Sequence, residues 1–138
     1  MASLIYNSFW DDVSRGNINP SVDTFKVMLV TSSYAEDKDT HLKRSAITNE
    51  VVGAGYTAGG TVATVGVTKD TVNDRVEISL GAVSWPAATI TARKAVCYKS
   101  RGGLATADEL VAVIDFGSDI ISTAGTFSLT ASTIRLQN

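Results

Sequence analysis

The sequence predicts an all-β fold, an antiparallel β-sandwich or jelly-roll-like barrel with one short N-terminal helix. Three observations indicate this class: apolar and polar residues alternate over most of the chain after Gly16, valine and threonine are abundant, and turn residues separate the alternating runs. No helical pattern long enough to connect parallel strands lies among these runs. We therefore expect residues 1–138 to form a single β-sandwich domain, with residues 1–16 as a short helical or arm-like segment.

The first expected element is one amphipathic helix at the N-terminus. Ile5, Phe9 and Val13 recur at four-residue spacing, which places them on one face of a helix. Ser3 is its expected N-cap and Gly16 its expected C-terminal stop. The apolar stripe either covers one end of the sheet or docks the protein onto a partner, and the sequence leaves both interpretations open.

Seven strands are expected after Gly16. The run from Arg75 to Leu80 alternates most regularly, with Val76, Ile78 and Leu80 on one face, as in an antiparallel strand with one wet side. The other six runs follow the same pattern: residues 24–31, 61–67, 94–98, 110–116, 126–130 and 133–136. Turn residues predict turns at six places: Asn73-Asp74, Gly81-Ala82, Trp85-Pro86, Arg101-Gly102-Gly103, Gly117-Ser118 and Ala124-Gly125.

Residues 32–60 form a long connection, and such connections are uncommon in compact domains and often functional. Its glycine-rich end formally matches the dinucleotide fingerprint G-x-G-x-x-G/A. A β-rich run follows instead of a helix, so the phosphates would have no helix N-terminus to bind. We expect a folded-over structural loop in which a tyrosine clamps glycines that let two backbones approach closely. Its residues are Gly53, Gly55, Tyr56, Gly59 and Gly60.

Composition and charge exclude several classes of protein. Hydrophobic residues make up 44% of the 138 residues and charged residues 19%, which excludes a disordered chain. Twelve basic and 14 acidic residues give a net charge of −2, and the basic residues form no concentrated patch, so nucleic-acid binding is not expected. The sequence has neither a signal-peptide pattern nor an apolar run of about 20 residues. We expect a soluble protein of a reducing compartment, with no membrane partner.

No residue pattern indicates catalysis, a metal or a cofactor. The single histidine, His41, lies in a polar segment and is expected to be a solvated loop residue. The single cysteine, Cys97, lies in a strand-like run and is expected to be a small buried hydrophobic residue. Asp37 and Asp39 lack the glycine and the twelfth-position carboxylate of a calcium loop. We therefore expect no catalytic residue, no metal ligand and no cofactor, and hence a protein that is not an enzyme.

Several motifs resemble a family of small virion structural proteins of tailed bacteriophages. The chain shares with this family a short opening segment, a D-T-x-K-V-x-L strand, a G-x-G-Y-T-A-G-G loop and a V-x-W strand. In this sequence they are Leu4–Phe9, Asp23–Leu29, Gly53–Gly60 and Val83–Trp85. The resemblance runs in order over roughly residues 4–117 and implies an all-β component of a virion.

Within that class, a small acidic β-sandwich suits a capsid decoration (cement) protein that bridges and stabilises major capsid subunits. The resemblance then implies a place on the outer capsid surface after assembly in the host cytoplasm. A lattice with two-fold and three-fold positions favours a dimer or trimer of the chain. The residues expected to touch a neighbouring subunit are Ile5, Tyr6, Phe9 and Trp10.

Two alternatives remain open for the virion component. It could be a tail or head–tail connector protein. It could also be a receptor- or carbohydrate-binding module, which would need aromatic side chains exposed on one sheet face. Trp85 and Tyr98 are the candidates, but both lie in apolar strands, so we expect them to be buried.

Overall fold

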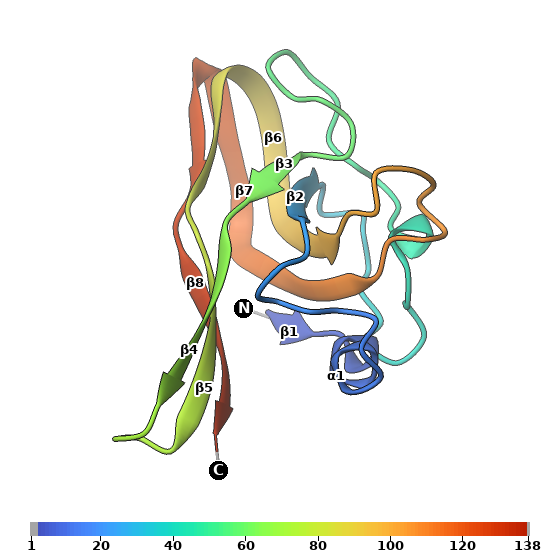
Figure 1. Ribbon diagram of the computed structural model, residues 1–138. Coiled ribbons are helices and arrows are strands. Elements are labelled where there is room, and N and C mark those ends of the chain that lie inside the picture. The colour runs from blue at the N-terminus through green and yellow to red at the C-terminus, as the bar shows by residue number, and fades with distance from the viewer. Residues whose placement is uncertain (1–2, 138) are drawn as a thin grey trace.

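The computed structural model describes residues 3–137, in which two antiparallel sheets accompany one α-helix (Figure 1). This confirms the predicted all-β class with one short helix near the N-terminus. In chain order the elements are β1 (Leu4–Ile5), α1 (Asn7–Ser14), β2 (Phe25–Val30), the 3-10 turn η1 (Arg44–Ala46), β3 (Thr61–Ala63), β4 (Val65–Asp70), β5 (Arg75–Leu80), β6 (Val83–Lys99), β7 (Leu110–Leu129) and β8 (Ser132–Gln137).

The two sheets share one long ribbon. The large sheet has the strand order β1-β7-β6-β2-β3, and the small sheet has the order β4-β5-β8. Two residues, Gly81 and Ala82, join β5 to β6, and Thr130 and Ala131 join β7 to β8, so the β5–β8 pair continues the β6–β7 pair. The small sheet therefore extends away from the large sheet and α1, towards the lower left of Figure 1.

Three of the predicted turns are wrong, because they lie inside long strands. Positive φ angles at Ala87, Gly117 and Ala124 bend β6 and β7 while the ladder between them continues. At the predicted turn Trp85-Pro86 the structure has a bulge instead: the pairing register shifts between Trp85 and Ala88, and β6 continues. The three mispredicted turns are Trp85-Pro86, Gly117-Ser118 and Ala124-Gly125.

The N-terminal helix begins later than predicted. The residues before it form β1, which pairs with β7, and α1 starts after Tyr6, whose backbone takes the N-cap position. Ser3 is not the cap: its hydroxyl accepts the backbone N–H of Asp115 at 3.0 Å. Gly16, at φ +80°, directly follows the C-cap residue and ends the helix as predicted.

The predicted strand over residues 61–67 divides at Thr64. Its first part, β3, pairs with β2 in the large sheet, and its second part, β4, pairs with β5 in the small sheet. The carbonyl of Thr64 accepts the backbone N–H of Gly81 at 2.7 Å, which fixes the point where the chain passes from one sheet to the other.

Both faces of the large sheet are buried where β2 crosses it. Val27 and Leu29 point into a core that includes α1 and the base of the small sheet, whereas Met28 and Val30 point into a second cluster. The long connection covers the second cluster and contributes Tyr34 to it. Packing on both sides explains why β2 is nearly continuously apolar.

Candidate interaction surface

The small sheet has one apolar face. Alternate residues of a strand share a face, and directly paired residues of neighbouring strands lie on the same side. The pairing therefore groups seven aliphatic side chains on one face, together with Lys69 and Ser132. The seven are Val65, Val67, Val76, Ile78, Leu80, Ile134 and Leu136. Leu80 is buried against the body of the molecule, but Val67 is 42% exposed and Leu136 is 56% exposed. The far half of this face thus has no cover within the described residues.

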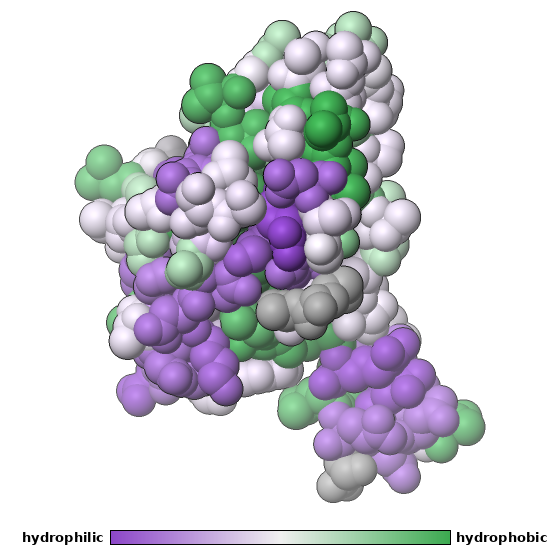
Figure 2. All heavy atoms as spheres, turned by 180° about the vertical axis from the view of Figure 1, so that it is seen from behind, coloured by the Kyte–Doolittle hydropathy of each residue, from purple (hydrophilic) through white to green (hydrophobic). Residues whose placement is uncertain are grey.

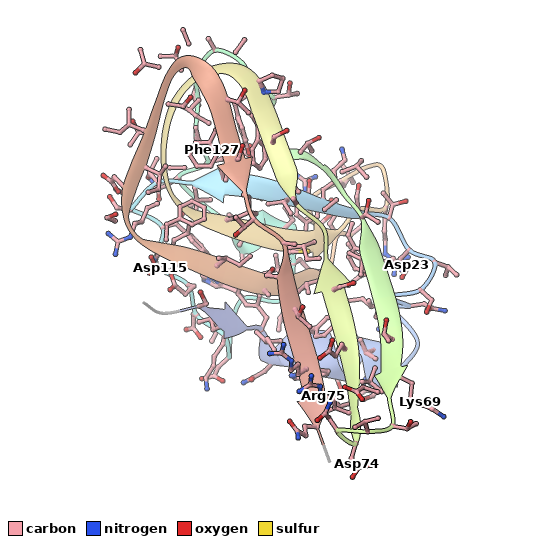
Figure 3. All side chains as sticks on the ribbon, turned by 90° about the vertical axis from the view of Figure 1, so that its left-hand side faces the viewer. Asp23, Lys69, Asp74, Arg75, Asp115 and Phe127 are labelled. Carbon is pink, nitrogen blue, oxygen red and sulfur yellow. The ribbon has the colours of Figure 1, made fainter. Side chains whose placement is uncertain are left out.

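The opposite face of the small sheet is polar and neutralises its own charges. The Arg75 guanidinium lies 3.4 Å from Asp70 and 2.7 Å from Glu77, and Arg135 lies 3.1 Å from Glu77. A hydrogen bond from the Asn73 side chain lowers the pKa of the Asp70 carboxyl. Two acidic and two basic side chains form this row, so the polar face needs no charged partner. Figure 3 shows Arg75 beside the turn at the far end of the sheet.

An open cleft of about 510 Å³ lies between the small sheet and the body. Arg135 is the one charged residue among the described residues that line it. Figure 2 shows the far end of the small sheet standing apart from the rest of the molecule, with hydrophobic side chains among hydrophilic ones. The body contributes Leu4, Ile5, Phe9, Phe25 and Ile114 to the cleft, and the small sheet contributes Val65, Ile78, Leu80 and Ile134.

Two sheet edges meet at this cleft. β8 is an outer strand of the small sheet and β1 is an outer strand of the large sheet, and residues of both line the cleft. No other strand of residues 3–137 pairs with the outer side of β8. Its outward N–H and C=O groups are therefore open to pairing with another extended segment.

The structure corrects part of the predicted partner interface. Tyr6 is 0% exposed and Phe9 is 1% exposed, because both side chains pack inside the chain's own core. They therefore present no surface to a neighbouring subunit in this fold. Ile5 and Trp10 are half-buried, and Ile5 lines the cleft. For these two residues the interface stays a prediction.

The glycine-rich loop packs its backbone against β2 and β6. A Cβ at Gly60 would lie 1.8 Å from the Val27 carbonyl oxygen, and one at Gly53 would lie 2.4 Å from the Thr89 carbonyl oxygen. Gly55 approaches β6 in the same way, with a Cβ position 2.6 Å from the Ala87 carbonyl oxygen. At these three positions only hydrogen fits, whereas Gly59 has no atom closer to its Cβ position than 3.4 Å.

Two tyrosines fasten this loop. The Leu29 backbone N–H donates to the Tyr56 hydroxyl at 3.0 Å, and the Tyr98 hydroxyl donates to the Gly59 carbonyl at 2.5 Å. The Glu50 carboxylate accepts the Gly59 N–H at 2.9 Å. Burial raises the pKa of Tyr56 well above its usual value and raises that of Tyr98 to about 12, so both hydroxyls stay protonated at neutral pH.

Asp108 and Glu109 form a buried charged cluster that the sequence did not indicate. Each is 1% exposed. Asp108 accepts a hydrogen bond from the Arg44 side chain at 2.7 Å and another from the Arg101 backbone N–H at 2.8 Å. The Arg101 guanidinium lies 2.6 Å from Glu109, and Lys43 lies 3.7 Å from it. These contacts join the long connection to the start of β7, which is a structural role. No local motif could signal it, because Arg44 and Asp108 are far apart in sequence.

His41 lies in a loop as predicted, but it is half-buried instead of fully solvated. Its ring stacks on Tyr34 at 5.7 Å, and its Nδ1 atom is 2.9 Å from the Tyr34 hydroxyl. The same hydroxyl is 2.7 Å from that of Tyr6, so the three side chains form one hydrogen-bonded row. Cys97 is buried as predicted, and burial raises the pKa of its thiol to about 12.

Trp85 and Tyr98 are buried as predicted, at 4% and 2% exposure. Neither ring is therefore open to a sugar. Among residues 3–137, no group of three or more histidine, cysteine, aspartate or glutamate side chains is arranged to hold a metal ion. No described helix is long and apolar enough to cross a membrane.

No protein-family model, no curated protein and no solved structure matches this chain. The cleft, the small sheet and the sequence motifs are therefore the basis for the functional proposal.

Proposed function

We propose that this chain is a non-enzymatic structural protein of a bacteriophage virion, specifically a capsid decoration (cement) protein that bridges major capsid subunits. The observation that carries this proposal is the small sheet, which extends from the body with half of its apolar face uncovered. Among the described residues, the outer edges of β4 and β8 have no pairing partner. Such a surface suits contact with a protein neighbour. The motifs shared with virion structural proteins favour the same class.

A bridging protein needs more than one contact region, and the chain also exposes aliphatic side chains outside the small sheet. Ile120 and Ile121 of β7 are 42% and 70% exposed, and Val52 of the long connection is 94% exposed. A chain that holds two neighbouring subunits at once raises the energy needed to separate them. Each contact can be weak, because the second forms at the high effective concentration set by the first. Packaged DNA pushes capsid subunits apart, so this kind of bridging would strengthen the particle.

The proposal is tested on purified particles of the phage that encodes the chain. Immunogold labelling with an antibody against this protein should decorate the outside of intact heads, with many labels on each particle. A chain that is absent from purified particles would refute the virion assignment. Labels confined to the tail or to the neck would refute the decoration role and favour the tail or connector alternative.

The tail or connector alternative also has one structural observation in its favour. Both outer strands of the small sheet, β4 and β8, are free among the described residues. Head-to-tail pairing of β8 with β4 of the next copy would produce a ring. Negative-stain images of the purified protein would reveal such rings.

A further inference from the structure

We propose that two copies of this chain associate through β8, which pairs antiparallel with β8 of the second copy to form a continuous six-stranded sheet. The strand order across the interface would be β4-β5-β8 followed by β8-β5-β4 of the second copy. This inference does not rest on the virion role, because it concerns only the surface of the chain itself.

Among the edges of the two sheets, β8 is the least protected. Natural edge strands avoid pairing by being short, by carrying lysine or proline, or by being bent. β1 has two residues and β3 has three, β4 carries Gly66 and Lys69, and Gly117 bends the outer edge of β7. β8 has six residues, no proline, a register with β5 that has no shift, and Arg135 as its one charge.

This pairing would place the aliphatic side chains of a second strand beside those at the edge of the apolar face, and would shield them from one side. Ile134 and Leu136 lie on the apolar side of β8, and Ile134 lines the cleft. A strand that joins the outer edge of β8 lies along the mouth of the cleft, because β8 forms part of its wall. That strand must present aliphatic side chains on the cleft side and polar ones on the other. β8 of a second copy meets this requirement, since it alternates in the same way.

Charge selects the register of the pair. If the two-fold axis passed through Arg135, its guanidinium would face the same group of the second copy, which is unfavourable. An axis through Ile134 instead places Arg135 opposite Thr133 and Ser132 opposite Leu136 of the second copy. Arg135 then keeps its ion pair with Glu77. The aliphatic side chains of both copies form one continuous strip in this register.

The first test is the association state of the purified full chain, measured by sedimentation velocity over a wide range of concentration. The chain of 14.5 kDa should shift to a dimer as concentration rises. Leu136→Lys should weaken the dimer at least ~10-fold, because one lysine from each copy would enter the continuous apolar strip. Val62→Lys is the matched control and should leave the dimer unchanged. Val62 is a similarly exposed aliphatic residue on an edge strand, at 60% against 56% for Leu136.

The second test identifies the register. Directly paired residues of antiparallel strands have Cα atoms about 4.5–5.5 Å apart, within the range that a disulfide spans. Ile134→Cys should therefore give a covalent dimer under mild oxidation, seen on a non-reducing gel, whereas Val62→Cys should stay monomeric. The native Cys97 does not interfere, because its thiol is buried. Circular dichroism checks that each variant folds.

Two results would overturn the proposal. One is a wild-type chain that stays monomeric at every concentration, which would assign the free edge to a different protein. The other is a dimer that Leu136→Lys does not weaken and that Ile134→Cys does not cross-link. Because the Leu136 side chain is largely exposed, its replacement tests the interface without disturbing the core.

Discussion

Replacing Gly60 with alanine should disrupt the anchoring of the glycine-rich loop. Gly60 has φ +78°, and a Cβ built there lies 1.8 Å from the Val27 carbonyl oxygen and 2.7 Å from the Met28 Cα. Both contacts are with backbone atoms of β2, which no side-chain rotation can move. Because ordinary contact begins near 3.4 Å, the loop would have to withdraw by roughly 1.6 Å.

The expected cost follows from two contributions. The left-handed backbone costs an alanine about 1–2 kcal/mol. Withdrawal of the loop also breaks the hydrogen bonds of Tyr56 with the Leu29 N–H and of Tyr98 with the Gly59 carbonyl, worth ~1 kcal/mol each. Gly60→Ala should therefore lower the free energy of unfolding by about 3–4 kcal/mol, and Tm by roughly 10–20 °C.

Gly102→Ala provides the matched control. Gly102 has almost the same backbone conformation, φ +80°, but no atom lies within 4 Å of its Cβ position. Gly102→Ala should lower the free energy of unfolding only by the cost of the left-handed backbone, about 1–2 kcal/mol. Urea denaturation of both variants, followed by circular dichroism, measures the difference. Equal losses for the two variants would refute the reasoning, because the close approach to β2 would then contribute nothing.

Three further predictions concern the N-terminal segment and the buried charges. In thermal melts, Phe9→Ala should lower the free energy of unfolding by about 3–5 kcal/mol, because Phe9 is buried. Trp10→Ala should lower it by about 1–2 kcal/mol, because Trp10 is partly exposed. Equal small losses would contradict the core position of Phe9. In urea denaturation, Asp108→Ala should cost about 3–5 kcal/mol, whereas the exposed pair member Asp11→Ala should leave stability almost unchanged. The Gly117 N–H and then the Arg93 guanidinium hold the pKa of Asp115 below its usual value, so its contribution is complete above about pH 4 and is lost as the pH falls through the folded-state value. The stability difference between Asp115→Asn and the wild type should accordingly shrink in acid, and a difference independent of pH would contradict this assignment.

Local alternation was enough to predict most of the strands. The predicted run from Arg75 to Leu80 coincides with β5, and β2 lies within the predicted residues 24–31. In β5 the alternation reports which face of the strand is buried, whereas the nearly continuous apolar run of β2 reports burial on both faces. The burial of Cys97, Trp85 and Tyr98 could be predicted because each lies in an apolar stretch of a strand.

Turn residues were less reliable, because the same residue types serve turns and bulges. Gly117 and Ala124 adopt the positive φ angles expected of turns, yet the strands on each side of them continue with the same partner. The sequence does not distinguish these cases, since the outcome depends on whether β6 bends at the matching place. Ala87 supplies that bend on the other strand.

Contacts between distant segments could not be predicted at all. From its neighbours in sequence alone, Tyr6 was predicted to be exposed and to contact a partner. It is buried because the long connection brings Tyr34 to within hydrogen-bonding distance of it, 28 residues later. His41 is half-buried through the same contact. The pattern of a single segment carries no information about the segment that covers it.

The same limit applies to the small sheet, where the sequence predicts an apolar face but not what covers it. The alternation of β5 predicts one dry face and one wet face, and the structure assigns only the near half of the dry face to the core, at Leu80. An isolated three-stranded sheet needs a covered apolar face to be stable. The far half keeps Val67 and Leu136 exposed beside Lys69, which pairs with Val76 on the same face. Exposed aliphatic residues of this kind are favoured where a second protein surface contacts them, which is why an interface of this protein is expected at β8.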